Sequence, residues 1–354
     1  MSATRPELRV LLLGLVFCHG AFAAGMVPIL NEVLSTRAPL SFALYFGAMV
    51  AGQGIVVLMP RVSDWDRALP AFEVLFAVAL LAMGALGSAS GFLWGRLLEG
   101  LSSGLTLPLI FSQVMRLRAW GSAEKRTGFM NSSFALGFVV GPFVVHGVGG
   151  WLDTQLLLWS FAAIFLGIAG AIVMRPPPAG RVVEASTATL PARRTMLFPL
   201  GLAKLTYGFT LAFIGGQASA AFSLPVAWVM LGLAIIFVGG QALATVLVRA
   251  VGTTRMLQVV PLGLAVGLCG LGLTGQGTWL FVVGGFHSML LLLGFRLFAG
   301  GPDDARTFAL FNVATDPALM VGALLAGLGA PGALVIAAAG ALAPLLGLRA
   351  EETR

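Results

Sequence analysis

The sequence has few of the charged residues that soluble proteins place on their surfaces. Only 10% of its 354 residues are Asp, Glu, Lys or Arg, while 58% are hydrophobic. A soluble domain carries about 25% charged residues. A chain with so little charge cannot cover a surface that faces water. This excludes a single soluble domain and makes lipid the main solvent of the protein.

Several chemical motifs are also missing. The two cysteines, Cys18 and Cys269, lie in apolar runs, which favours packing over a disulfide. No Gly-x-x-x-x-Gly-Lys-Ser/Thr loop for ATP is present. No soluble Ser/His/Asp set indicates an enzyme, and the three histidines lack the spacing of metal ligands. We therefore expect a protein that is not an enzyme, holds no metal or cofactor, and takes its energy from an ion or substrate gradient.

What the sequence does contain is long apolar runs. A spanning helix needs about 20 mainly apolar residues. The segments that satisfy this are 10–30, 41–60, 69–88, 91–114, 127–148, 153–174, 196–215, 223–248, 256–274, 278–299, 305–327 and 331–348. In lipid, runs of this length satisfy their backbone hydrogen bonds only as helices. We therefore predict an all-α membrane protein with 12 transmembrane helices.

The basic residues indicate the orientation of these spans. If every second loop is placed on the side of the N-terminus, 18 of the 21 Lys and Arg residues lie on that side. By the positive-inside rule, both termini are then cytoplasmic. The distribution of the charge between spans also argues against a nucleic-acid partner. The loop 175–195 is predicted to be a cytoplasmic linker between an N-terminal half, 1–174, and a C-terminal half, 196–354.

An internal repeat supports two halves. Three residue pairs match at a constant offset of 181, and in each half they fall in the fifth span. The pairs are Lys125 with Arg306, Asn131 with Asn312, and Gly141 with Gly322. Half-chain repeats are common in transporters. We therefore expect two pseudo-symmetric six-helix bundles.

Together with these spans and this repeat, the following motifs make the sequence resemble the major facilitator superfamily, over essentially its whole length. The residues of span 5 that match the antiporter signature of this family are Gly128, Gly137, Gly141 and Pro142. Val145 and His146 stand where the family has a closing glycine pair. In the family, this signature marks export by proton antiport. The resemblance implies the fold of that superfamily and a function close to that of its drug/proton antiporters.

Two further motifs of the family are partly present. Span 4 resembles its Arg-x-x-x-Gly pattern through Arg96 and Gly100. The loop after span 2 resembles its Gly-x-Leu-x-Asp-Arg loop through Asp64 and Arg67, with Pro60 in place of the glycine. In the family, such loops hold the two halves together on the cytoplasmic side.

Gly137 and Gly141 are spaced by four residues, so they share one face of a helix and allow close approach of a second backbone. Pro142 removes the hydrogen bond to the carbonyl of Phe138 and favours a kink. We expect a packing seam and a hinge for the rocking of the halves. The alternative is ordinary small-residue contact.

Charged residues inside spans are costly, about 2.5–3.5 kcal/mol each at mid-bilayer, so they usually line a cavity or pair. Arg96 and Glu99 are three residues apart and can pair. Ser103, Thr106 and Gln113 continue their stripe along span 4. We expect this stripe to face a central cavity, with Glu99 able to take a proton when Arg96 turns away. The alternative is a structural ion pair near the outer interface.

Other polar residues inside spans complete the expected substrate and proton pathway. Asp316 is the most isolated carboxyl in the sequence and follows Asn312 on the same helix face; its alternative role is helix packing. Lys204 precedes Tyr207 by one turn and can alternatively reach the interface. The further candidates are His19, Asn131 and His287. A buried histidine can titrate near neutral pH or can serve packing.

The function predicted from these residues is secondary active transport of a small organic molecule by alternating access. We expect proton-coupled efflux through the inner membrane of a bacterium, by a monomer embedded in the lipid bilayer. A proton-coupled importer of a polar metabolite is one alternative, and a non-transporting intramembrane enzyme or receptor is another. The mixed charges suit a zwitterionic substrate, but they do not identify it.

Overall fold

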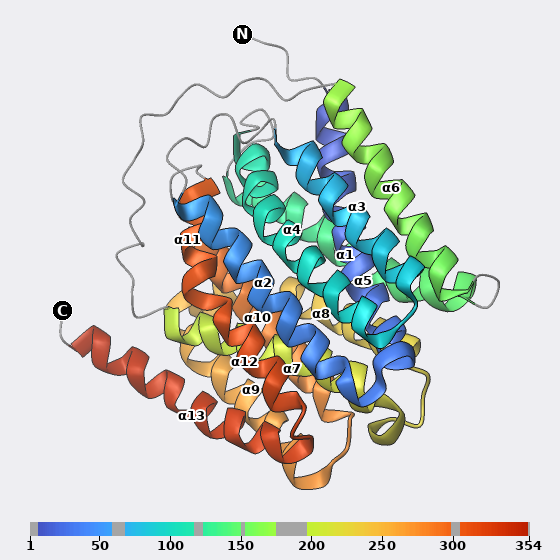
Figure 1. Ribbon diagram of the computed structural model, residues 1–354. Helices are drawn as coiled ribbons and strands as arrows, with labels where there is room; N and C mark the ends of the chain where they lie inside the picture. Colours follow the sequence, from blue (N-terminus) through green and yellow to red (C-terminus); the bar gives the residue numbers. More distant parts are fainter. Residues whose placement is uncertain are drawn as a thin grey trace. The chain divides into compact units, whose positions relative to one another are not determined.

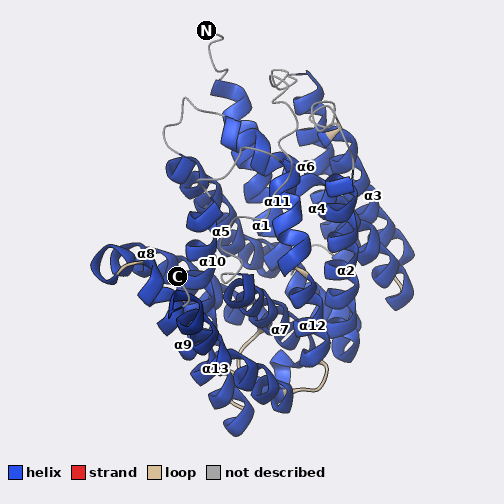
Figure 2. Cartoon of the chain, turned by 90° about the vertical axis from the view of Figure 1, so that its left-hand side faces the viewer, coloured by secondary structure: helices blue, strands red, loops and turns tan. Residues whose placement is uncertain are grey.

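The computed structural model describes residues 6–58, 68–116, 123–149, 153–174, 197–298 and 305–352. Within these ranges nearly every residue is helical and none lies in a strand (Figure 2). The predicted loop residues Asp64 and Arg67 and the predicted linker 175–195 fall outside the described residues.

Each predicted span coincides with helical structure to within a few residues (Figure 1). The elements are α1 (Pro6–Leu34), η1 (Ser35–Arg37), α2 (Ala38–Leu58), α3 (Leu69–Leu86), α4 (Ala89–Arg116), α5 (Ala123–Gly149), α6 (Thr154–Met174), α7 (Leu197–Ala221), α8 (Val226–Val251), α9 (Thr253–Thr274), α10 (Trp279–Phe298), α11 (Ala305–Thr315), α12 (Pro317–Ala326) and α13 (Ala330–Glu352). The segment 305–327 is divided into α11 and α12 at Asp316, because Pro317 lacks the amide hydrogen that would continue α11. The described stretch Phe308–Ala326 across this point is nevertheless long and apolar enough to cross a membrane as one span.

Eight stretches of the described residues are long and apolar enough to cross a membrane. The first stretch, Arg9–Leu58, contains both α1 and α2. Two further apolar helical stretches, Trp279–Leu293 and Ala330–Leu342, are shorter. The length and composition of these helices therefore agree with an all-α membrane protein.

Local residue chemistry explains several helix ends. The backbone amide of Leu156 donates to the Asp153 carboxylate at 2.7 Å, which caps the start of α6. The Ser88 hydroxyl accepts from the Gly91 amide at 3.1 Å and caps α4 in the same way. The helix α3 ends at Gly87 (φ 56°), a left-handed conformation that glycine adopts without strain. Polar caps and a glycine thus stop helices that apolar composition alone would extend.

The described residues form two compact units. Unit 1 comprises Met1–Gly25, Leu44–Leu190 and Ala299–Val313, and unit 2 comprises Met26–Ala43, Pro191–Phe298 and Ala314–Arg354. These units differ from the predicted halves by two short segments. Residues 26–43 belong to unit 2, and residues 299–313 belong to unit 1. The division at a linker over 175–195 stays a prediction.

In unit 1, α3 packs between α4 and α6, and α5 packs on both α4 and α6. The start of α11 joins this unit, since the ring of Phe308 stacks on that of Phe111 in α4 with the centroids 4.0 Å apart. The unit is filled by apolar and aromatic side chains. Phe22, Phe76 and Phe165 are among its largest fully buried residues.

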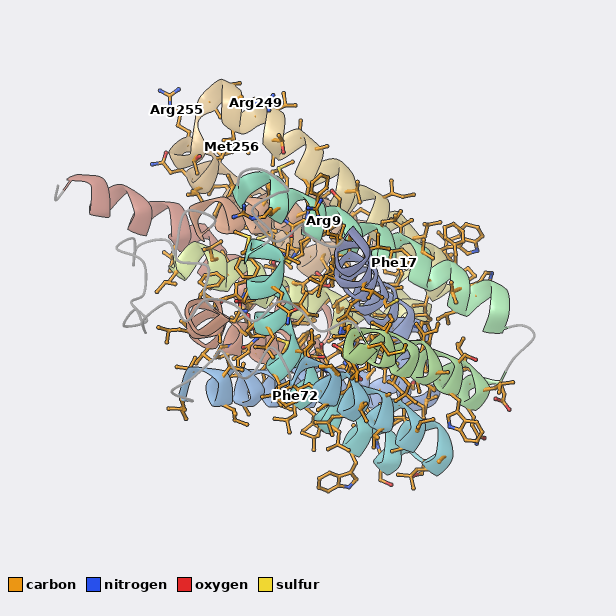
Figure 3. The ribbon with its side chains drawn as sticks, turned by 90° about the horizontal axis from the view of Figure 1, so that it is seen from above. Arg9, Phe17, Phe72, Arg249, Arg255 and Met256 are labelled. Carbon is orange, nitrogen blue, oxygen red and sulfur yellow. The ribbon has the colours of Figure 1, made fainter. Side chains whose placement is uncertain are left out.

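In unit 2, α7 packs on α12, α10 and α13, while α9 packs on α13 and α10. The end of α1 joins this unit through Asn31, whose side-chain amide donates to the carbonyl of Gly215 at 2.7 Å. Arg249 and Arg255 lie close to the turn at Gly252 that joins α8 to α9, and both are exposed (Figure 3). Charged side chains thus mark this end of unit 2.

The predicted packing seam is present between α5 and α1. A Cβ added to Gly137 would collide with the carbonyl oxygen of Phe17, and one added to Gly141 would collide with that of Ala21. Only glycine allows two backbones to approach so closely. Pro142 is buried inside α5, which is continuous from Ala123 to Gly149. The seam is therefore a structural fact, and the hinge stays a prediction.

The same kind of seam joins α12 to α7 in unit 2. A Cβ on Gly322 would collide with the carbonyl oxygen of Leu205, and one on Gly208 with that of Leu319. Gly141 and Gly322 are 181 residues apart in the sequence. Gly141 contacts the main chain of α1 and Gly322 that of α7, and each of these is the first long helix of its predicted half. An internal repeat predicts this equivalence.

Replacing Gly141 with valine should force α5 away from α1. Overpacking of this kind costs about 1–3 kcal/mol, so the purified variant in detergent should unfold at a lower temperature. The matched control is Gly128→Ala, because a Cβ at Gly128 meets no atom within 4 Å. Equal losses of stability in the two variants would contradict the seam.

Candidate functional site

A buried ion pair lies on α4 in unit 1. The guanidinium of Arg96 donates to the carboxylate of Glu99, as their spacing of three residues predicts. The two residues are 3% and 2% exposed. The Arg96 guanidinium also lies over the ring of Tyr45 in α2, 4.2 Å from its centroid, in a cation–π contact. One cation is thus neutralised by a carboxylate and covered by an aromatic face.

Gly100, one helical turn after Arg96, explains how α2 approaches α4 so closely. A Cβ on Gly100 would collide with the carbonyl oxygen of Tyr45, and one on Gly104 with that of Met49. The absence of these side chains lets α2 lie directly against α4. Gly100 therefore positions the Tyr45 ring beside Arg96.

The polar stripe predicted along α4 is buried. The side-chain polar atoms of Ser103, Thr106 and Gln113 have no hydrogen-bond partner among the described residues, and neither does the side-chain nitrogen of Asn131 in α5. Buried polar groups are nearly always hydrogen-bonded, to water or a ligand when no protein group is available. The stripe is therefore a candidate polar pathway within unit 1.

A second buried pair in unit 1 includes a residue that the sequence reasoning missed. His19 of α1 and Glu73 of α3 lie 3.2 Å apart between Nε2 and Oε1. They are 6% and 0% exposed. The missed signal was present in the sequence, since Glu73 is the one charged residue of the span 69–88. His19 is thus placed by a carboxylate on another helix.

In unit 2, Lys204 of α7 forms an ion pair with the carboxylate of Asp316. The sequence predicts that Asp316 is an isolated carboxyl, and the structure shows instead that it is paired. It lies at the break between α11 and α12, where the backbone amides at the start of α12 favour a negative charge. The Lys204–Asp316 pair is the centre of the candidate site in this unit.

Aromatic and polar groups of unit 2 lie next to this pair along α7. The ring of Tyr207, one turn after Lys204, stacks on His287 of α10 with centroids 4.8 Å apart and planes 5° apart. The hydroxyl of Thr206 lies 3.5 Å from Nδ1 of His287. His287 is 2% exposed, and its Nε2 has no partner among the described residues. The structure thus brings four of the predicted residues together in unit 2.

The remaining predicted residues are more scattered. Asn131 lies on α5 and Asn312 on α11, both buried. His146, near the end of α5, is exposed. Within the described part of the chain, no three His, Cys, Asp or Glu side chains lie close enough to hold a metal ion.

No protein-family model matches the sequence, and no curated protein matches it. The structure is nevertheless similar to that of the human organic anion transporter MFSD10 (TETRAN), with a TM-score of 0.66 and 17% identity over 97% of this chain and 100% of that chain. It is also similar to a POT family transporter in complex with 5-aminolevulinic acid, with a TM-score of 0.70 and 12% identity over 98% and 95%.

These similarities extend over nearly the whole length of each chain. The chain therefore has the all-helical fold of these two transporters. At these identities the likeness establishes the fold alone. The buried charged residues therefore carry the argument about function.

The Lys204–Asp316 pair can be tested by a double-mutant cycle. Asp316→Asn leaves the part-buried Lys204 without its counter-charge, which should cost about 3–5 kcal/mol of unfolding free energy. Adding Lys204→Met should restore most of this loss, because no buried charge remains. The measurement is unfolding of the purified variants in detergent. Additive losses in the double variant would show that the two side chains do not stabilise each other.

Proposed function

We propose that this protein is a proton-coupled secondary transporter that exports a small organic molecule by alternating access. The fold supports the transporter class. The observation that carries the proposal is the set of buried charges. Arg96 and Glu99 lie in α4, Lys204 lies in α7 and Asp316 lies directly before α12, in two opposite-charge pairs. Charged residues inside a membrane are costly and are commonly functional.

The energy source follows from the missing motifs. The sequence has no ATP-binding loop, so the energy comes from an ion gradient or from the substrate's own gradient, and we propose an ion gradient. Protons are the proposed ion because the buried charged sites contain carboxylates and imidazoles, which bind protons by changing their own charge. Glu99, Asp316, His19 and His287 are the candidate proton carriers from the predicted set. Arg96, Lys204, Tyr207, Asn131 and Asn312 are proposed to line the substrate pathway.

Export is favoured over uptake by the span-5 resemblance to proton antiporters. Its glycines at Gly137 and Gly141 form the α1–α5 seam described above. We propose that Pro142 makes this seam a hinge. The positive-inside distribution supports cytoplasmic termini. The compact chain favours the inner membrane of a bacterium. The monomer is the proposed working form. Import of a polar metabolite is the second candidate function.

The substrate class is proposed from the local charges. The cations Arg96 and Lys204 are each already neutralised by a carboxylate. A zwitterion fits such a pathway, because its two charges can exchange with those of a pair. One structural relative is named as an organic anion transporter and another was solved with 5-aminolevulinic acid, which is itself zwitterionic at neutral pH.

Transport in vesicles tests the function and its direction. Proteoliposomes with an imposed pH gradient should accumulate the zwitterion 5-aminolevulinic acid. The anion p-aminohippurate and the cation ethidium serve as comparison probes. Everted membrane vesicles should accumulate the substrate when the lumen is acidic, and a protonophore should abolish this. Accumulation in right-side-out vesicles would instead support the importer. Transport that ignores both the pH gradient and the protonophore would contradict proton coupling.

Replacing Asp316 with asparagine should abolish gradient-driven transport, because the side chain can then neither bind a proton nor pair with Lys204. The double variant Lys204→Met/Asp316→Asn, which leaves no unpaired charge, should be stable but equally inactive. Asp153→Asn is the matched control, since it changes an exposed carboxylate to a residue that still caps a helix. An unchanged pH dependence in Asp316→Asn would dismiss a proton role for this residue.

A further inference from the structure

We propose that His19 and Glu73 form a proton-binding site in unit 1, at which the imidazole and the carboxylate share one exchangeable proton. The site is separate from the two ion pairs described above and lies between α1 and α3. It rests on the proposed function only for its use in transport; the binding of the proton is argued from the pair itself.

The first argument is the isolation of Glu73. The carboxylate is fully buried, and only Oε1 has a partner, the imidazole of His19 at 3.2 Å. Oε2 has no hydrogen-bond partner among the described residues. A buried carboxylate is strongly disfavoured unless a counter-charge or a proton neutralises it. On α3 no other charged residue is available, and His19 is the group placed to share a proton with this carboxylate.

The second argument is the apolar surroundings of the pair. The His19 ring lies 5.0 Å from the rings of both Phe76 and Phe165, between centroids. Phe76 comes from α3 and Phe165 from α6, and α6 has no titratable residue anywhere between Thr154 and Met174. These rings exclude polar groups from this side of the pair. The proton on the pair therefore governs the charge at this point of the unit.

The third argument is the charge of the neighbouring groups. His19 interacts electrostatically with Glu99 of α4, which is paired with Arg96. Cys18, next to His19 on α1, interacts with Glu73 and is uncharged as a thiol. With both carboxylates ionised, Glu73, Glu99 and Arg96 together carry one net negative charge. A single proton on the His19–Glu73 pair makes the group neutral, and its loss leaves one uncompensated negative charge.

This charge count suggests how the site acts. When the pair holds the proton, either as imidazolium and carboxylate or as imidazole and carboxylic acid, the buried group is neutral. When the proton leaves, the negative charge can be balanced by a positive group of the substrate beside Glu99. One proton is thus exchanged for one positive charge, which suits the ammonium group of a zwitterion or an organic cation.

The packing around the pair keeps it in place. The hydroxyl of Ser102 on α4 donates to the carbonyl of Phe72, the residue before Glu73, and so ties α4 to α3. On α1, Gly20 follows His19, and a Cβ there would collide with the carbonyl oxygen of Phe134 in α5. Phe17 and Phe72 mark these two helices in Figure 3. His19 and Glu73 are therefore held by rigid helices and not by loops.

Difference infrared spectroscopy of the purified protein tests proton binding directly. A change in pH should produce a carboxylic-acid or imidazole band that is lost in Glu73→Gln, whose amide keeps the shape of the side chain and can still bond to His19. The band should survive in the control Glu32→Gln, which changes an exposed carboxyl of α1. A band unchanged in a folded Glu73→Gln protein would overturn the proposal.

Transport separates this site from the proposed function. In vesicles, Glu73→Gln should lose accumulation driven by a pH gradient but keep exchange of the same probe at equal pH on both sides. Should Glu73→Gln fail to fold, the exchanged variant His19→Glu/Glu73→His restores both groups and should recover the infrared band. A band that depends on Glu73 in a protein that moves none of the three probes would support the site and contradict the transporter. If the wild-type protein transports a probe and Glu73→Gln keeps gradient-driven accumulation, the transporter is supported and the use of this site in transport is contradicted.

Discussion

The structure depends on one constraint: a charged side chain inside an apolar helix needs an opposite charge or a proton within reach. The described residues satisfy it in three ways. Arg96 takes its carboxylate from the next turn of its own helix, Lys204 takes one from another helix, and Glu73 faces an imidazole. In lipid the alternative is a charge without a partner, which costs several kcal/mol. The positions of these pairs therefore restrict how the helices can pack.

Glycine makes the required approach possible. The seams at Gly141 and Gly322 bring α5 against α1 and α12 against α7, and Gly100 brings Tyr45 of α2 to Arg96. Without a hydrophobic driving force between helices in lipid, such close packing is a main source of cohesion. The same residues that weaken a helix in isolation thus stabilise the bundle and position its charged groups.

The two units meet the constraint with different geometry. In unit 2 the acidic partner lies at a helix break, where Pro317 removes one backbone hydrogen bond and the start of α12 favours a negative charge. In unit 1 the helices are continuous, and a histidine mediates between Glu73 and the pair on α4. An imidazole can hold and release a proton near neutral pH, which a lysine–carboxylate pair does less readily.

The sequence by itself determined the membrane environment, the helical spans and the residues whose charge is costly there, because hydropathy and helix length act locally along the chain. It also predicted the Arg96–Glu99 pair, since a spacing of three residues is enough to place two side chains together. Only the tertiary structure decided that Asp316 has Lys204 as its partner and that Glu73 faces His19. These partners are 112 and 54 residues apart, and no local pattern specifies which faces of distant helices meet. That choice is made by the packing of glycine and aromatic side chains between helices, which exists only once the chain has folded.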